Sequence, residues 1–127
     1  MRKKIMIVED NFTNIKLYNY ILSNIDAEKK IVKDGESALK MVDEFRPNVI
    51  LLDIKIPKIS GIEVAKTIRQ DPKNSDIIIV AVTAYSMRGD KEKIIEAGCD
   101  HYISKPIDTR SFGDFISKLL KPNLLAS

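Results

Sequence analysis

The stretch Val49-Ile-Leu-Leu-Asp-Ile-Lys-Ile-Pro-Lys-Ile-Ser-Gly61 (VILLDIKIPKISG) places a carboxylate directly after four apolar residues. The run Val49–Leu52 is continuous and rich in β-branched residues, which is typical of a strand buried on both faces of a parallel sheet. Asp53 follows this run, and a carboxylate removed from water must be paired or neutralised. We therefore expect Asp53 to be the first residue past a central strand, with Pro57 and Gly61 turning the chain into the next helix.

Apolar runs of strand length recur along the chain and alternate with segments of helical periodicity. The predicted strands are Ile5–Val8, Glu28–Lys33, Val49–Leu52, Ile77–Val82 and Tyr102–Ser104. The predicted helices are Phe12–Asn24, Gly35–Phe45, Gly61–Gln70, Ser86–Ala97 and Thr109–Leu120. Asp34 is the expected N-cap of the second helix. This alternation predicts an α/β fold, a doubly wound flavodoxin-like (βα)5 sandwich of three layers with helices on both faces of a parallel sheet.

Composition limits the classes of function. The chain has 127 residues, 44% hydrophobic and 31% charged, with a net charge of +3, which fits one globular domain. We expect a domain over residues 1–121, a short tail over 122–127 and no output domain. The lysines are dispersed rather than gathered in a basic stripe, so nucleic-acid binding is not expected. No apolar run approaches the roughly 20 residues that span a bilayer. One cysteine, expected to be buried, excludes an internal disulfide framework and favours the cytoplasm.

Polar side chains follow four of the predicted strands. Glu9 and Asp10 come after the first, Asp53 after the third, Thr83 after the fourth and Lys105-Pro106 after the fifth. In an open parallel sheet these positions meet at one edge, where ligands bind. Clustered carboxylates repel one another unless a cation is present, and hard oxygen ligands suit Mg²⁺. A lysine and a hydroxyl can bind phosphoryl oxygens, so this set predicts phosphoryl transfer to an aspartate.

Each of these residues also has a plainer interpretation. Glu9 and Asp10 could form a solvated turn, with Asp10 serving only as a helix cap. Asp53 could cap the loop before the next helix, and Thr83 could be a helix N-cap. Lys105 alone would be an ordinary surface lysine. Their coincidence at one edge of the sheet is what favours a functional site.

These residues together resemble the receiver domains of two-component response regulators. The matching segments are Glu9-Asp10-Asn11, LLDIKIPKISG around Asp53, Thr83-Ala84 and Tyr102-Ile-Ser-Lys-Pro106. The resemblance covers Lys4–Leu120 and implies the strand order 2-1-3-4-5. Within the family, the segments are most similar to DivK-type single-domain regulators, and similar stretches occur in receivers attached to hybrid histidine kinases.

The resemblance implies a metal site around a phosphoacceptor. Asp53 matches the phosphoacceptor. Asp10 matches the acid that ligates Mg²⁺ (or Mn²⁺) directly, and Glu9 the acid that acts through metal-bound water. The backbone carbonyl of Lys55 matches a further ligand. Asp53 is then expected to be partly exposed in a shallow acidic pocket.

The resemblance also implies a switch. Thr83 and Lys105 match the groups that contact the phosphoryl oxygens, and Tyr102 matches an aromatic residue that moves inward with Thr83. The Lys105–Pro106 bond is expected to be cis. The helix Ser86–Ala97 is expected to shift, because it has few core anchors (Met87, Ile94, Ile95) and an interior glycine, Gly89.

The function implied is that of a phosphoacceptor signalling protein, not an enzyme beyond its own phosphotransfer and autodephosphorylation. A histidine kinase or a histidine phosphotransfer protein would donate the phosphoryl group to Asp53. A downstream protein would bind the face formed by Ser86–Ala97, Tyr102–Ser104 and Thr109–Leu120, and the chain would be a monomer or a weak dimer, with a role in cell-cycle or cell-division control.

Four alternatives remain. One is a receiver module detached from a hybrid histidine kinase. Another is a phosphorylation-independent scaffold, which would be expected to lose one of the five residues. A haloacid-dehalogenase-like phosphatase would need a second Asp two residues after Asp53, where this chain has Lys55. A flavodoxin-like cofactor protein would need a phosphate loop in place of the acids after the first strand.

Overall fold

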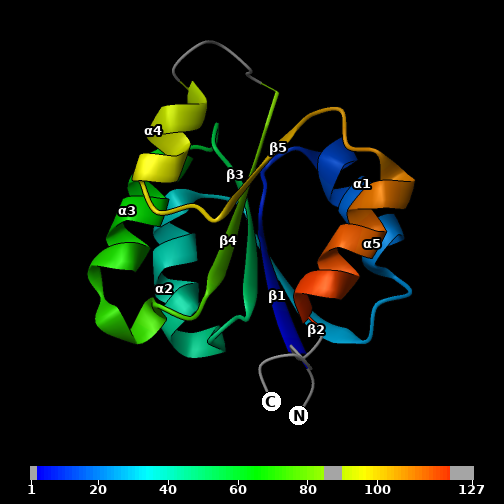
Figure 1. The fold of residues 1–127 in the computed structure, drawn as a ribbon, viewed down its shortest axis with the longest axis horizontal. Helices are drawn as coiled ribbons and strands as arrows, with labels where there is room; N and C mark the ends of the chain where they lie inside the picture. Colours follow the sequence, from blue (N-terminus) through cyan, green and yellow to red (C-terminus); the bar gives the residue numbers. More distant parts are fainter. Residues whose placement is uncertain (1–2, 85–89, 121–127) are drawn as a thin grey trace.

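The computed structural model describes residues 3–84 and 90–120, in which strands and helices alternate (Figure 1). The elements are β1 (Lys3–Val8), α1 (Phe12–Leu22), β2 (Ala27–Val32), α2 (Gly35–Phe45), β3 (Val49–Asp53), α3 (Gly61–Gln70), the 3₁₀ turn η1 (Pro72–Asn74), β4 (Ile78–Thr83), α4 (Asp90–Glu96), β5 (His101–Ser104) and α5 (Thr109–Leu120).

The five strands form one parallel sheet in the order β2-β1-β3-β4-β5, which confirms the predicted fold. Because all strands run the same way, their carboxyl ends meet at one edge, the upper edge in Figure 1. The central strand β3 is buried along its whole length. That burial explains why its sequence is a continuous apolar run rather than an alternating one.

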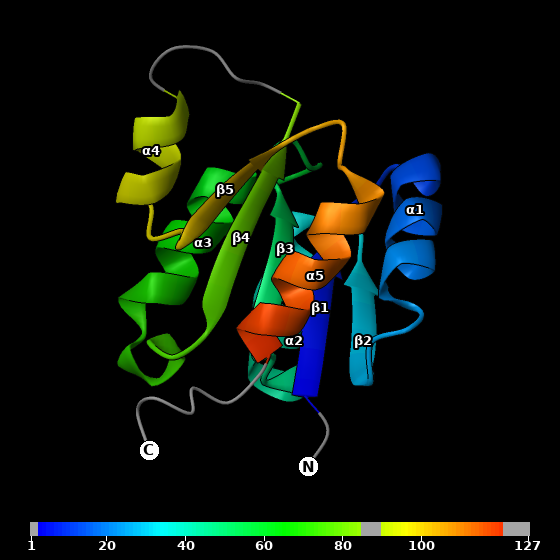
Figure 2. The same cartoon turned by 45° about the vertical axis from the view of Figure 1, so that its right-hand side comes forward.

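Helices cover both faces of the sheet, and each face has its own core. In both views α2, α3 and α4 lie on one face and α1 and α5 on the other (Figures 1 and 2). Side chains of β1 alternate between the two cores: Met6 and Val8 belong to the α2–α4 side, and Ile5 and Ile7 to the α1–α5 side. The period of two along a strand produces this division.

Most predicted helix limits agree with the structure, and the differences have local causes. The helices Gly35–Phe45, Gly61–Gln70 and Thr109–Leu120 are as expected. Asp34 is the N-cap of α2, accepting from the Ser37 amide at 2.8 Å. The first helix ends at Leu22 rather than Asn24, because the Ser23 hydroxyl donates to the Tyr20 carbonyl at 2.8 Å.

The prediction for α4 is partly wrong. Ile94 is buried, but Ile95 is exposed, so Ile95 is not a core anchor. The seven described residues of α4 form an amphipathic helix with one face on the core and one face in solvent. Ile95 lies on the solvent face. The predicted beginning of this helix, with Met87 and Gly89, lies outside the described residues, as does the predicted tail.

A cluster of polar contacts, here called the amino-edge cluster, joins α3 to the turn before β5. The Arg69 guanidinium donates to the carbonyl of Gly98 at 2.8 Å, to the carbonyl of Asn74 at 3.0 Å and to the Asp100 carboxylate at 2.6 Å. The Asp100 carboxylate also accepts from the Ile79 amide at 2.8 Å. Gly98 has a φ of 107°, and a side chain there would collide with Arg69. The cluster therefore fixes the amino end of β4 and the turn into β5.

The described helices are short. The longest, α5, has 12 residues. Across residues 3–84 and 90–120, no helix combines the length and apolar character that crossing a membrane requires.

Candidate functional site

The register of the sheet brings the residues at the carboxyl ends of four strands side by side. Val8 of β1 pairs with Leu52 of β3, so the next residues, Glu9 and Asp53, are neighbours. Asp53 in turn pairs with Val82 of β4, which places Thr83 one position beyond. Thr83 pairs with Ser104 of β5, so Lys105 continues the same row. The predicted site residues therefore meet at the carboxyl edge.

Three carboxylates form a cluster at this edge. One oxygen from each of Glu9, Asp10 and Asp53 lies within 4.8 Å of the others. Glu9 is fully buried and Asp10 is exposed. Asp53 is the last residue of β3 and only 7% exposed. The expectation of a partly exposed Asp53 past the strand end is thus wrong, because β3 continues through Asp53 and its carboxylate contacts Lys105 and the Lys55 amide.

Lys105 bridges two of these acids. Its ammonium nitrogen lies 3.1 Å from Glu9 Oε1 and 3.3 Å from Asp53 Oδ2. The second oxygen of each carboxylate accepts a backbone amide: Glu9 Oε2 from Asn11 at 3.2 Å, and Asp53 Oδ1 from Lys55 at 3.1 Å. Both carboxylates are therefore held in fixed orientations by the backbone on one side and by Lys105 on the other.

The electrostatic balance at this edge is unfavourable for Asp53. The pKa of the Asp53 carboxyl is raised to about 6, first by burial and then by the hydrogen bond and negative charge of Glu9, against which the Lys105 charge and the Lys55 amide act. Burial also raises the pKa of the Tyr18 hydroxyl well above its ordinary value, with added contributions from Glu9 and Asp53. Negative charge therefore exceeds what Lys105 offsets.

A divalent cation fits this donor set. The oxygens of Glu9, Asp10 and Asp53 are hard ligands, and the excess of negative charge is the condition that Mg²⁺ or Mn²⁺ relieves. Because Asp10 is exposed, ligand positions on its side of the cluster stay accessible to water, as Mg²⁺ requires. The Lys55 carbonyl as a further ligand stays a prediction.

The helix caps exclude Asp10 as the cap of α1, whereas Asp53 does accept the Lys55 amide in the loop that follows it. Asn11, not Asp10, caps α1, since the Asn11 side chain accepts from the Asn14 amide at 3.0 Å. Ser60, not Asp53, caps α3, since the Ser60 hydroxyl accepts from the Glu63 amide at 3.3 Å. Neither Asp10 nor Asp53 is needed to begin the helix that follows it.

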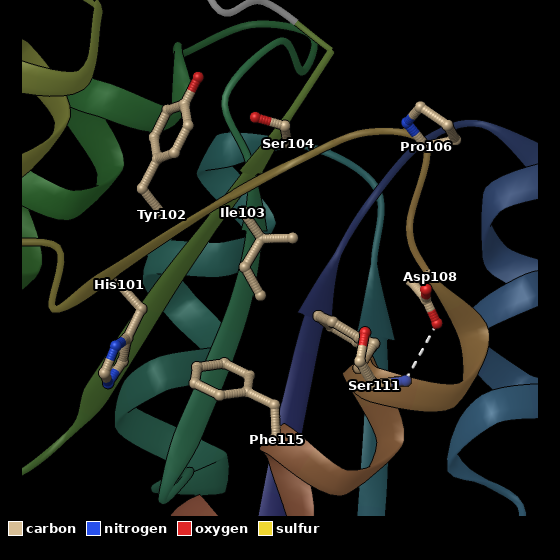
Figure 3. A pocket seen from close by; sticks show the side chains of 9 residues that line it. His101, Tyr102, Ile103, Ser104, Pro106, Asp108, Ser111 and Phe115 are labelled. Atoms are coloured by element: carbon tan, nitrogen blue, oxygen red, sulfur yellow. Dashed lines mark hydrogen bonds between the residues drawn. The ribbon is translucent and has the colours of Figure 1, made fainter.

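The remaining site residues lie on β4 and β5. Thr83 is buried at the end of β4, and its carbonyl accepts from the Lys105 amide at 2.9 Å. The Lys105–Pro106 peptide bond is cis. Tyr102 is half-buried and packs against the core on the α2–α4 side, while Ile103 faces the α5 side (Figure 3). Tyr102 thus lies on the face of the sheet that carries α4.

The contact between Glu9 and Lys105 was not predicted. These residues are 96 positions apart, and no local pattern links them. The sequence indicated only that both residues follow strands. That signal predicts that they lie at the same edge of the sheet, but not that they form an ion pair.

Known proteins resemble this chain in sequence and in fold. The family model for the response regulator receiver domain matches residues 5–123. The chain belongs to the response regulator receiver family. Among curated proteins, this receiver is 42% identical over 120 residues to the polar-differentiation response regulator DivK of Brucella anthropi, covering 94% of this chain and 98% of the relative.

Solved receiver structures share the fold. The receiver domain of the sensor histidine kinase PA1611 from Pseudomonas aeruginosa is 26% identical, with a TM-score of 0.84 over 94% of this chain and 98% of that one. That structure has a magnesium ion coordinated in the active-site cleft. The Mn²⁺-bound response regulator Rcp1 is 28% identical, with a TM-score of 0.78 over 92% of this chain and 91% of that one.

Proposed function

We propose that this receiver is a stand-alone, phosphorylation-switched response regulator that accepts a phosphoryl group on Asp53. The observation that carries the proposal is the cluster of Glu9, Asp10 and Asp53 with Lys105 bridging two of its acids. The stand-alone form is supported by the DivK relative, 98% of which is covered by this chain. We therefore favour it over a receiver detached from a hybrid histidine kinase.

The proposed reaction transfers the phosphoryl group from a phosphohistidine of a histidine kinase or a phosphotransfer protein. An Asp53 carboxylate oxygen attacks phosphorus, and the phosphorus–nitrogen bond breaks. The electron pair stays on the histidine nitrogen, which takes up a proton. Lys105 already contacts one Asp53 oxygen at 3.3 Å, so its ammonium is positioned to stabilise charge on the transferred group.

Mg²⁺ or Mn²⁺ held by Asp10, Asp53 and, through water, Glu9 would neutralise negative charge on the donor and acceptor oxygens. The chain's own contribution is orientation. The Lys55 amide holds one Asp53 oxygen at 3.1 Å, and the Asn11 amide holds Glu9 at 3.2 Å. These contacts keep the acids in place when Lys105 exchanges one partner for another.

The proposed switch is a competition for Lys105 and Thr83. The phosphoryl group adds roughly −1.5 to −2 charges and new acceptor oxygens. Lys105 and the Thr83 hydroxyl then bind these oxygens, and Tyr102 moves toward the space that Thr83 leaves. The movement is passed to α4, the helix that follows β4.

The proposed output surface is the face of α4, β5 and α5, where a downstream protein would bind. A pocket of about 440 Å³ lies between β5 and α5 and is lined by His101, Tyr102, Ile103, Ser104, Pro106, Asp108, Ser111, Phe112 and Phe115 (Figure 3). Because Pro106 directly follows Lys105, a change at the site is close to this pocket. We propose a monomer or weak dimer in the cytoplasm, with a role in cell-cycle or polarity control as the DivK relative's name suggests.

Phosphotransfer with Mg²⁺ tests the proposal. Wild-type protein, Asp53→Asn and Asp76→Asn are incubated with a phosphorylated histidine kinase or with acetyl phosphate, and the label is followed. Asp76 is an exposed acid away from the site and serves as the matched control. We expect label on the wild type and on Asp76→Asn, release by hydroxylamine, and none on Asp53→Asn. Label that persists in Asp53→Asn, or that resists hydroxylamine, contradicts an aspartyl phosphate.

A second measurement separates the switch from a scaffold. Partner affinity is compared with and without phosphorylation. A ligand or modification that gives no difference in affinity shifts no equilibrium. Equal affinities would therefore support a phosphorylation-independent scaffold.

A further inference from the structure

The loop from Ile54 to Ser60 connects the phosphoacceptor strand to α3, and its base closes without space for a side chain. The Gly61 amide donates to the Ile54 carbonyl at 2.9 Å. A Cβ on Gly61 would lie 2.6 Å from Ile54 Cα and 2.7 Å from the Asp53 carbonyl oxygen. The loop therefore folds back on itself immediately after Asp53.

The tip of the same loop is held by a different element, the beginning of α2. The Gly35 amide donates to the Pro57 carbonyl at 3.4 Å. A Cβ on Gly35 would lie 2.6 Å from the Ile59 carbonyl oxygen and 2.8 Å from Ile59 Cβ. Such separations force one side to shift, and here the obstacles are backbone and a branched Cβ rather than a flexible chain end.

Gly35 is not required by its own backbone conformation. It is the first residue of α2 and does not have a positive φ. Glycine is also a poor helix former. The close approach of the loop is thus the physical reason for the missing side chain at this position.

The loop tip is held in a conformation that needs support. Lys58 has a φ of 70°, which a residue with a Cβ adopts only where its surroundings impose it. The Lys58 ammonium lies 4.0 Å from Glu36 of α2. Gly35 and Glu36 thus contact the three residues at the loop tip, Pro57, Lys58 and Ile59. This tip begins two positions after Lys55.

We propose that Gly35 is a positioning residue for the phosphoacceptor site. Its missing side chain lets α2 hold the loop where the Lys55 amide binds Asp53 and where Lys55 can turn its carbonyl to a metal ion. The inference rests on the proposed function, since it concerns the metal site used for phosphorylation. Gly35 acts through the loop and touches no reacting atom.

The test is Gly35→Ala, with Gly113→Ala as the matched control. Both changes add one methyl group to a helical glycine, but a Cβ on Gly113 would meet Ile21 at an ordinary 3.6 Å. Binding of MgCl2 alone is measured by calorimetry, and the Lys55 amide resonance is followed by NMR. We expect Gly35→Ala to weaken Mg²⁺ binding about tenfold and to move the Lys55 resonance, as changes behind a ligand commonly do. Gly113→Ala should bind as the wild type does.

A folded Gly35→Ala that binds Mg²⁺ as tightly as the wild type overturns the inference and leaves the proposed function standing. Wild-type protein that binds no Mg²⁺ overturns both. A measurement on the wild type decides the matter if Gly35→Ala does not fold. In a MgCl2 titration the Gly35 and Lys55 amide resonances should shift with the same midpoint, and a Gly35 resonance that stays still overturns the inference.

Discussion

The two edges of the sheet both carry clustered charges, but the charges are balanced at one edge and not at the other. In the amino-edge cluster, Arg69 meets Asp100 and two backbone carbonyls, and Asp100 also accepts a backbone amide. At the carboxyl edge, Lys105 contacts only Glu9 and Asp53 of the three clustered carboxylates, and the pKa of Asp53 rises to about 6. Balanced charges stabilise the fold, whereas the excess of negative charge at the carboxyl edge leaves binding free energy for a cation.

The largest effect is expected at the balanced edge. Arg69→Ala removes three hydrogen bonds and the packing of Arg69 over Gly98, and we expect a loss of about 2–3 kcal/mol in the free energy of unfolding. Urea denaturation measures it. Lys73→Met is the control, because Lys73 pairs with Asp43 and Asp71 only on the exposed surface and should show no measurable change. Equal values for the two variants would mean that the amino-edge cluster does not stabilise the fold.

Removing a charge at the carboxyl edge should have the opposite effect and raise the free energy of unfolding. In Mg²⁺-free buffer at pH 7, Asp53→Asn is expected to raise the free energy of unfolding by about 2 kcal/mol, since ionised Asp53 is held in an unfavourable environment. Asp76→Asn, which changes an exposed acid, should leave stability unchanged.

The pH dependence follows from the same shift. The folded pKa of Asp53 is raised above 3.8, so the stability that this group contributes is present below about pH 4 and is lost as the pH rises through about 6. The difference between Asp53→Asn and wild type should therefore be absent near pH 4 and complete above pH 6. Urea titrations at several pH values test this, and a difference that does not vary with pH would assign it to packing.

Removing a neutral hydrogen bond at the carboxyl edge should lower stability, as removing Arg69 does at the amino edge. Asn11→Ala removes the side chain that caps α1, and we expect a loss of about 1 kcal/mol. The backbone amide that holds Glu9 is retained. If Asn11→Ala were as stabilising as Asp53→Asn, the contrast would lie in the position of the residues rather than in their charge.

The smallest effect is expected in the labelling rate of the Cys99 thiol, which lies next to Asp100 of the amino-edge cluster. Burial raises the pKa of its thiol to about 11, with the Asp100 charge adding to the shift. About one thiol in a thousand is then ionised at pH 8, and labelling by a disulfide reagent should be slow. Stability contributed by this group is lost as the pH rises from 9 through about 11. Faster labelling in Arg69→Ala would report local opening, and an unchanged rate would place the opening elsewhere.

The sequence predicts this fold well because its signals are local. The apolar run before Asp53, the cap Asp34 and the stripe on α5 each depend on neighbours within one element. The row of site residues followed from strand ends alone. The contacts that were missed join distant segments: Glu9 with Lys105, Arg69 with Asp100, and Gly35 with the loop after β3. Burial of Asp53 was misjudged for the same reason, since its cover comes from other strands.

The strand order also governs when the site can form during folding. Lys105 is separated along the chain by 52 residues from Asp53 and by 96 from Glu9. Contacts this distant require most of the chain to be organised first, and they are associated with slow folding. A half-folded chain with β1 to β3 in place would have its acids but not its lysine. Because the acids that would hold Mg²⁺ come from β1 and β3, Mg²⁺ added during refolding should report the pairing of these two strands, before β5 and Lys105 arrive.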